Sequence, residues 1–286
     1  MISKRMIDIV TVVFKDELPI LKVQAESVDL YCKELGTQTI FVIVNDDDSV
    51  ADQIDPAWWG SLRSQVQIIP RSSFACQFVE NGWVSQQVLK LLGSSLSRNT
   101  WSMLLDAKTL VSDCMTSDIF VVNSNQLTLG IGPVLSVFEP AAKIAGDLFG
   151  ITVAHVADPA GVPFIFNNQD VRQMIDKIET MTHNNFAEWF QRQGMLTEFV
   201  LYTAFIQYKY QDLTKVYLER NRAKLCNNIC HSEVKIFDIK LQHARDRRPL
   251  TVGVHRNAWQ QLTEQQKQSY RDYLESIGLT TARSLT

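Results

Sequence analysis

The chain has 286 residues, of which 45% are hydrophobic, so it is long enough to bury a sizeable core as one large α/β domain or two small ones. It carries 28 basic and 31 acidic residues, and this near balance excludes a global field that would attract nucleic acid or an anionic membrane. The five cysteines show no paired CxxC spacing, the first residues lack the apolar run of a secretory signal, and no apolar run approaches the roughly 18–20 residues of a membrane helix. We therefore expect a cytoplasmic protein with no transmembrane segment.

Strand and helix signals alternate along the first third of the chain. Ile7–Phe14 is apolar and β-branched almost throughout, as in a strand that is covered on both faces of a parallel sheet. Leu18–Leu35 has apolar residues at helical spacing and ends before Gly36. Further strands are predicted at Gln38–Val44, Val66–Pro70 and Trp101–Asp106, with a helix over Gly82–Ser97. This order predicts an α/β fold with a mostly parallel central sheet flanked by helices.

The rest of the chain is less regular. Helices are predicted at Pro140–Gly150, Asn167–Met181, Thr197–Tyr210 and Asn257–Gly278, and short strands at Phe120–Gly132, Val234–Lys240 and Leu250–His255. No internal repeat, proline-rich linker or low-complexity tract divides the sequence. We therefore predict a single domain.

Polar residues follow the predicted strands of the first third. Phe14 and Lys15 follow the first strand, Asn45 and Asp46 the second, and Asp106 ends the fourth. Ligands of open α/β sheets bind beyond the carboxyl ends of the strands, so we expect these five residues to lie along one rim.

Seven stretches, in their order along the chain, resemble a known family. They are IDIVTVVFKDE, TIFVIVND, GWVSQQVLKL, WSMLLDAKTLV, PFIFNNQDV, TEFVLYTAF and VGVHRNAW. From about Ile7 to Trp259 the sequence thereby resembles little-characterised microbial and viral glycosyltransferases of the GT-A fold. The resemblance implies a Rossmann-like single domain over residues 1–286. It also implies that a nucleotide-sugar donor, often a UDP-sugar, is held by the half to about residue 113, and a saccharide or other hydroxyl acceptor by the half from about 114 to 286.

Asp106 is the strongest candidate site residue, because burying an unpaired carboxylate at the end of so apolar a strand is strongly unfavourable. The family's usual Asp-x-Asp pattern supplies two carboxylates to Mn²⁺ or Mg²⁺, but Ala107 and Lys108 follow here. Either Asp106 binds the metal with help from His255, or Lys108 supplies the positive charge without a metal, or activity has been lost. The resemblance implies that His255 and the neighbouring Arg256 reach the metal or the diphosphate, although a lone histidine is more often structural.

Polar residues of the donor half complete the predicted binding site. Asn45 and Asp46 either read a uracil edge or the ribose, or merely cap a loop. On the helix over Gly82–Ser97, amide and ammonium groups suit a diphosphate or sugar hydroxyls, unless they are simply solvated positions. These helix residues are Trp83, Gln86, Gln87 and Lys90.

Two carboxylates are candidates for chemistry at the sugar carbon. Glu198 follows Thr197 at a predicted helix start, where the resemblance implies a base that deprotonates the acceptor hydroxyl. Glu198 equally suits the plain role of complementing the positive end of the helix dipole. Asp170, beside Asn167 and Asn168, either fixes acceptor hydroxyls or starts its own helix.

Three functions are therefore open. The first is a glycosyltransferase, and the second is a nucleotide-sugar or glycan-binding protein that has lost catalysis through the change at Lys108. The third is an unrelated phosphate-handling α/β enzyme such as a nucleotidyltransferase. The sequence has no GxxxxGK[ST], no GxGxxG after the first strand and no GxSxG elbow, which disfavours the third function.

Overall fold

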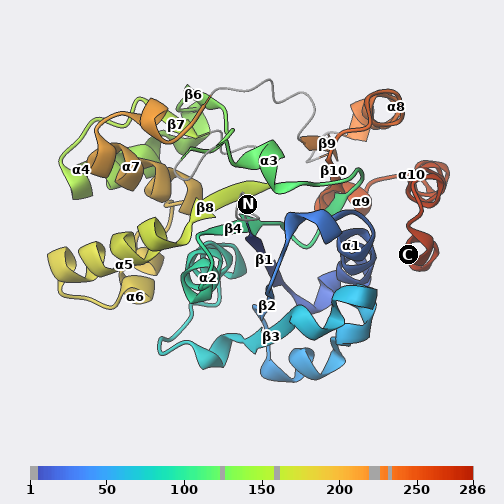
Figure 1. Cartoon of the computed structure of the whole chain (residues 1–286), viewed down its shortest axis with the longest axis horizontal. Coiled ribbons are helices and arrows are strands. Elements are labelled where there is room, and N and C mark those ends of the chain that lie inside the picture. Colours follow the sequence, from blue (N-terminus) through green and yellow to red (C-terminus); the bar gives the residue numbers. More distant parts are fainter. Residues whose placement is uncertain (1–5, 123–125, 158–161, 219–225, 231–233, 286) are drawn as a thin grey trace, which may run out of the picture.

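A five-stranded sheet in the order β3-β2-β1-β4-β8 forms the centre of the computed structural model, which describes residues 6–122, 126–157, 162–218, 226–230 and 234–285 (Figure 1). Its strands are β1 (Ile7–Val13), β2 (Ile40–Val44), β3 (Val66–Pro70), β4 (Trp101–Leu104) and β8 (Phe164–Asn167). Every residue of β1, β2 and β4 is buried, which explains why these segments are apolar rather than alternating. The predicted α/β class with a mostly parallel sheet is confirmed.

The direction of the strands locates the rim where a ligand would bind. β1 pairs in parallel with β2 on one side and with β4 on the other, and β2 pairs in parallel with β3. The strand order therefore reverses between β1 and β4, which makes a topological switch point at their carboxyl ends. β8 is antiparallel to β4, with Asn167 opposite Trp101, so β8 ends at the other rim.

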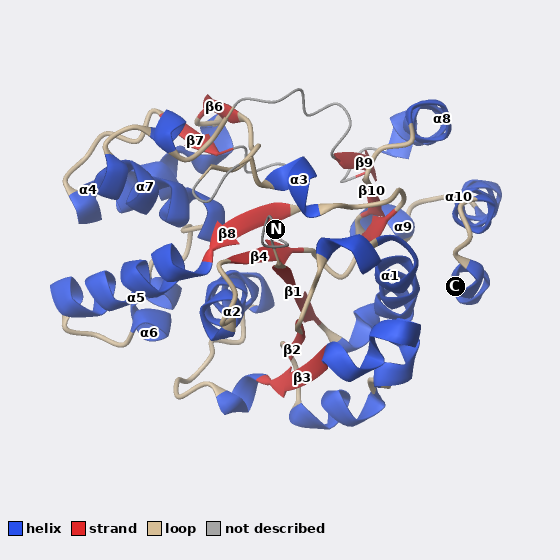
Figure 2. Ribbon diagram, viewed as in Figure 1, coloured by secondary structure: helices blue, strands red, loops and turns tan. Residues whose placement is uncertain are grey.

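Helices cover both sides of this sheet, with α1 and α2 on opposite sides of β1 and β2 (Figure 2). α2 packs against β1 and β2 and also contacts α5, α6 and α7, so it is covered on most sides. The helices are α1 (Leu18–Tyr31), α2 (Gly82–Leu96), α3 (Ser117–Phe120), α4 (Glu139–Phe149), α5 (Asn168–Thr182), α6 (Phe186–Arg192), α7 (Glu198–Tyr210), α8 (Phe237–Arg247), α9 (Arg256–Trp259) and α10 (Glu264–Ser276).

Two smaller sheets lie outside the central sheet. One has the order β5-β10-β9, and the other joins β6 to β7. Their bounds are β5 (Thr109–Val111), β9 (Cys226–Cys230), β10 (Thr251–Val254), β6 (Ile131–Pro133) and β7 (His155–Ala157). β5 follows directly on the loop after β4, so this loop connects the central sheet to the second sheet. A separate apolar core, which includes Leu110, Val252, Phe237 and Leu274, lies under β5, β10, α8 and α10.

The predicted helices that became α1 and α4 are confirmed with small shifts. α1 ends at Tyr31, and a 3-10 turn over Lys33–Leu35 carries the chain to Gly36, whose φ of 70° suits a residue without Cβ. Gly150 ends α4 in the same left-handed conformation.

Among the described residues, no helix combines the length and apolar character needed to cross a bilayer.

The prediction of a strand over Val234–Lys240 is wrong. A 3-10 turn and the start of α8 occupy this segment. Its short alternation of apolar residues is typical of a strand, but Phe237, Leu241 and Ala244 continue at helical spacing and are all buried. The helical face reaches the second core, and this burial decides the structure.

Two other predicted segments differ from the structure. The C-terminal helix over Asn257–Gly278 is divided into α9 and α10, because Thr263 caps α10 through a capping box with Gln266. The strand over Phe120–Gly132 is reduced to an isolated bridge between Val121 and Leu127 and to the first two residues of β6, and residues 123–125 lie outside the described part.

Candidate functional site

The turn after β4 presents Asp106 and Lys108 at the switch point. The backbone N–H of Thr109 donates to the Asp106 carbonyl at 2.7 Å, which closes a four-residue turn. Gln24 of α1 donates from Nε2 to the carbonyls of Asp106 (2.6 Å) and Thr109 (2.9 Å). A Cβ at Gly253 would lie 3.0 Å from the Lys108 carbonyl, so glycine lets β10 pack closely on this turn. The turn is therefore fixed from two sides.

Four charged side chains meet here, and we call them the lysine–carboxylate cluster: Lys90, Asp106, Lys108 and Glu198. Lys90 Nζ lies 2.9 Å from Asp106 Oδ1 and 2.9 Å from Glu198 Oε1. Lys108 Nζ donates to Asp106 Oδ2 at 2.8 Å. Two ammonium groups and two carboxylates thus neutralise one another.

The cluster joins three parts of the sequence that lie far apart. Lys90 comes from α2, Glu198 is the first residue of α7, and Thr197 caps that helix by accepting from the Val200 N–H. The Lys90 and Glu198 side chains are only 5% and 1% exposed, whereas Asp106 is 16% exposed. Lys90 is therefore not on the open helix face that the sequence suggested, because α5, α6 and α7 cover that side of α2.

Burial and the paired charges shift the pKa values of this cluster. Burial alone would raise the pKa of Asp106, but Lys108 and Lys90 outweigh it and hold the pKa well below its usual range. Burial opposes the charged form of Lys90, yet Asp106 and Glu198 raise its pKa. Burial raises the pKa of Glu198 in spite of Lys90. The two carboxylates therefore have pKa values shifted in opposite directions.

Predicted residues of α2 extend the cluster toward the surface. With the Gln87 amide nitrogen turned to Glu198, it donates to Glu198 Oε1 at 2.8 Å, and its oxygen accepts from Trp83 Nε1 at 3.2 Å. Trp83 is exposed and Gln86 is half-buried. Trp83, Gln87 and Glu198 thus form a line of hydrogen bonds that ends at Lys90.

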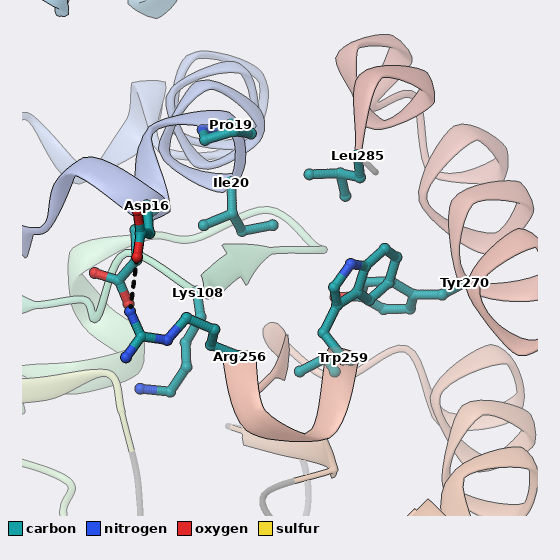
Figure 3. A pocket seen from close by; sticks show the side chains of 10 residues that line it. Asp16, Pro19, Ile20, Lys108, Arg256, Trp259, Tyr270 and Leu285 are labelled. Carbon is teal, nitrogen blue, oxygen red and sulfur yellow. Dashed lines mark ion pairs between the residues drawn. The ribbon is translucent and has the colours of Figure 1, made fainter. Parts of the chain in front are cut away.

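A cavity of about 160 Å³, here called the Trp259 cavity, opens beside Lys108 (Figure 3). Asp16 and Glu17 follow β1, Val254 ends β10, and Arg256 begins α9, so the cavity lies at the carboxyl rim. Figure 3 shows Asp16, Lys108 and Arg256 on one side and the apolar side chains on the others. The lining residues are Asp16, Glu17, Pro19, Ile20, Lys108, Val254, Arg256, Trp259, Tyr270 and Leu285. Lys108 therefore belongs to both the cluster and the cavity.

Glu17 is a site residue that the sequence analysis missed. Burial raises the pKa of this carboxyl, while Lys108 and the Phe14 N–H, which donates to it, lower it. Arg256 and Asp106 also act on it electrostatically. Gln24 was missed too, although a signal existed: it is a polar residue between Leu21, Ala25 and Val28 on the buried stripe of α1.

The predicted rim residues lie at the expected edge, but they bond to the protein. Asn45 Oδ1 accepts from Ser85 Oγ at 3.0 Å, and Asn45 Nδ2 donates to the Gly82 carbonyl at 3.1 Å. Asp46 accepts from the backbone N–H of Lys15 at 3.1 Å. A Cβ at Gly82 would lie 2.8 Å from the Phe14 ring. In this arrangement, both polar groups of Asn45 join β2 to the start of α2.

The residues present do not fit a divalent cation. Ammonium groups contact both Asp106 oxygens, and His255 Nδ1 accepts from the Asn257 N–H at 3.2 Å as the cap of α9. Among the described residues, no three His, Cys, Asp or Glu side chains are grouped so as to hold a metal ion. Of the alternatives left open by the sequence, Lys108 as the positive charge agrees with this geometry.

Asp170 lies away from the cluster. Its carboxylate accepts from Lys209 Nζ at 2.5 Å and from Tyr210 OH at 3.2 Å, both at the end of α7. Glu198 begins the same helix, so at a rise of about 1.5 Å per residue the two ends of α7 are about 18 Å apart. Because β8 runs antiparallel to β4, the start of α5 lies at the opposite rim. The structure therefore does not bring Asp170 together with Glu198.

The sequence matches one protein family over most of its length. The chain belongs to a family of unknown function, DUF6492, whose profile matches residues 7–263. No curated protein sequence matches the chain significantly.

Several solved structures are similar in shape at low sequence identity. The galactosyltransferase LgtC, in complex with donor and acceptor sugar analogs, is 12% identical, with 95% of this chain and 96% of LgtC covered and a TM-score of 0.45. The glycosyltransferase GlyE of Streptococcus pneumoniae TIGR4 is 12% identical, with 95% and 62% covered and a TM-score of 0.47. The bifunctional glycosyltransferase WbbM is 14% identical, with 97% and 50% covered and a TM-score of 0.48. The chain thus spans less than two thirds of the latter two.

Proposed function

We propose that this chain is a GT-A glycosyltransferase that transfers a sugar, in particular the hexose of a UDP-hexose, to a saccharide or other hydroxyl acceptor. One observation carries the proposal. Asp106, Lys108 and Lys90 converge with Glu198 at the topological switch point, beside a cavity whose mouth has a second cation, Arg256. Of these residues, Asp106 and Glu198 are ones that the resemblance to GT-A enzymes implies, whereas Lys108 stands where the family's pattern has its second carboxylate.

Sugar transfer breaks the bond between the anomeric carbon and the diphosphate oxygen. The electron pair leaves with the diphosphate, and the acceptor oxygen forms the new bond to carbon. A cation fixed at the leaving oxygen stabilises the charge that develops there. We assign this role to Lys108, which is held by Asp106 at 2.8 Å, with Arg256 as a second cation. Lys108 thus takes the place that a metal ion holds in Asp-x-Asp enzymes.

The proton of the acceptor hydroxyl needs a base. Burial raises the pKa of Glu198, as a general base requires, but its carboxylate is 1% exposed and is turned toward Lys90 and Gln87. A substrate would reach Glu198 only after these side chains move. The base role of Glu198 therefore stays a prediction, whereas the contacts support a positioning role in which Glu198 fixes Lys90.

A second candidate function follows from one observation. Lys90 is only 5% exposed, and the cluster neutralises its own charges, so it is also suited to stabilise a binding site without turnover. This alternative is a nucleotide-sugar or glycan-binding protein that has lost catalysis.

A donor panel separates the two functions. UDP- and GDP-sugars are incubated with the full chain, with Mn²⁺ or with EDTA, and released nucleotide diphosphate is measured. Release that persists in EDTA supports a transferase with Lys108 as the cation. Saturable binding without release supports the binding protein, and release only with Mn²⁺ contradicts the role given to Lys108. The role of Lys108 is tested in the same assay with Lys108→Ala. Lys143→Ala is its matched control, because Lys143 also pairs with a carboxylate, Asp147, at 2.6 Å, but on the exposed surface of α4.

A further inference from the structure

The last part of the chain carries a local excess of positive charge. The segment from Lys235 to Arg248 contains five basic and two acidic residues, so its formal charge is +3. The whole chain has a formal charge of -3, so all the other residues together have -6. The near balance of charges over the chain therefore conceals a basic segment on an otherwise acidic protein, and most of this segment is α8.

Two faces of α8 are occupied by the rest of the protein. The apolar face is buried in the second core. Asp238 accepts from Gln266 Nε2 at 3.1 Å, and Arg245 Nη2 donates to the Ser269 carbonyl at 3.1 Å. Both partners belong to α10. Because Asp238 and Arg245 are seven residues apart, they lie on one face of α8, and this face is turned to α10.

A third face of α8 is turned away from α10, and Figure 1 shows this helix at the outer edge of the molecule. Residues three, four or seven positions apart form one stripe along this face, starting at the N-cap of the helix. We call it the α8 stripe, and its residues are Ile236, Ile239, Lys240, His243 and Arg247. Ile239 is 59% exposed and Ile236 is 37% exposed, although both are large apolar side chains. The stripe thus combines exposed isoleucines with basic residues and contains no carboxylate.

This combination selects the kind of partner. A soluble polyanion such as RNA would contact the basic side chains and leave the isoleucines in water. A bilayer that contains anionic lipids accepts both kinds of side chain, because the isoleucines enter the headgroup layer while the cations stay at the lipid phosphates. A helix at the outer edge of a protein also meets such a surface without needing a matching groove.

The acidic remainder of the protein does not prevent this contact. At physiological ionic strength, charges are screened beyond about 8 Å, so the residues nearest to a membrane decide whether it attracts the protein. The more distant acidic residues instead disfavour other orientations. An anionic surface would therefore be approached with α8 first.

We propose that the α8 stripe is a peripheral membrane-binding surface for anionic phospholipids. Ile236 and Ile239 enter the headgroup layer, and Lys240 and Arg247 contact the lipid phosphates. Two isoleucines and a few cations give weak and reversible binding that depends on salt. The proposal does not depend on the proposed function, because no residue of the lysine–carboxylate cluster takes part in it.

Co-sedimentation of the full chain with lipid vesicles tests the proposal. The protein should bind vesicles of phosphatidylcholine that contain phosphatidylglycerol, but not vesicles of phosphatidylcholine alone, and added NaCl should release it. Arg247→Gln should weaken binding about 5-fold, the effect of one basic residue near an anionic surface. Ile239→Ser should weaken it by a similar factor through loss of apolar contact. Both side chains are exposed, so the fold should tolerate these changes.

Matched controls come from another part of the surface. Val137→Ser removes an apolar side chain that is 65% exposed, and Lys143→Gln removes an exposed lysine of α4. Both variants should bind vesicles as the wild type does. Binding that needs no phosphatidylglycerol, or that survives in both stripe variants, overturns the proposal. It also fails if Arg247→Gln weakens binding to the vesicles and to a labelled RNA while Ile239→Ser binds both normally, because the partner is then a polyanion and not a bilayer.

Discussion

In the part of the chain that the structure describes, buried carboxylates pair with lysines at both rims of the central sheet. Asp106 and Glu198 share Lys90 at the carboxyl rim, while Asp170 pairs with Lys209 at the opposite rim. The same two residue types are thus used at both places. What differs is the surroundings, because the first group adjoins the switch point and a cavity, whereas the second joins α5 to α7.

This difference shows that residue chemistry alone does not identify a site. Glu198 and Asp170 were both candidates in the sequence, the first as a base and the second for fixing acceptor hydroxyls, and each stands in the first turn of a helix. The direction of β8 separates the two residues. Because β8 is antiparallel to β4, it carries the chain to the rim opposite the switch point, and Asp170 follows it there. We therefore interpret the Asp170 group as a structural tie.

Removing the central ammonium of each group should give the largest difference between them. Lys90→Met should lower the free energy of unfolding by about 3–5 kcal/mol, because two buried carboxylates lose a shared partner. Lys209→Met should cost only about 1 kcal/mol, because Lys209 is 29% exposed and Tyr210 still donates to Asp170. Urea unfolding followed by circular dichroism measures both. Equal losses would mean that the two groups do not differ in their dependence on the lysine.

Activity should separate the two rims in the same way. Lys108→Ala should slow nucleotide release about 100-fold, as expected for loss of a group that stabilises the leaving charge. Lys209→Ala should leave the rate within about twofold, because its ion pair lies at the other rim. Lys108→Arg keeps the charge and should retain part of the rate. A large effect of Lys209→Ala on the rate, with folding intact, would place the Asp170 group in the site after all.

The sequence predicted the sheet because β1, β2 and β4 are buried on both faces, which only continuous apolar runs satisfy. It predicted neither β8 nor its direction, because this short strand is defined by its pairing with β4, a distant segment of the chain. Asp106 was found from a local rule about buried charges. The partner of Lys90 could not be found in this way, since Glu198 lies 108 positions further along the chain.

The turn that holds Asp106 gives a smaller test, because Gln24 ties it to α1. Gln24→Leu should lower the free energy of unfolding by about 1–3 kcal/mol, since the carbonyls of Asp106 and Thr109 both lose the Gln24 amide as a donor and the Asp106 carbonyl keeps only the Thr109 N–H. It should also slow nucleotide release by misplacing Lys108. Gln207→Leu is the control, because Gln207 of α7 also donates to the backbone, but to one carbonyl only, that of Thr152, and at a more exposed place. If Gln24→Leu behaves like this control, the turn keeps its shape without α1.

The smallest expected effect is the pH dependence of the ion pairs of Asp106. Its pKa is lowered in the folded state, so the unfolded chain binds the proton more readily. The stabilisation is fully present above the ordinary value of about 3.9 and is lost as the pH falls toward the lowered pKa, by about 1 kcal/mol per pH unit. The difference in unfolding free energy between the wild type and Asp106→Asn should therefore be constant from pH 7 to 5 and shrink below pH 4.

Glu198 acts with the opposite sign, because its raised pKa makes the folded state take up a proton first. Glu198 is present in both proteins, so its effect on the difference largely cancels. Asp147→Asn, which removes a carboxylate from an exposed pair, is the charge-matched control. A difference that stays constant down to pH 3 would mean that Lys90 and Lys108 do not hold Asp106 in its ionised form.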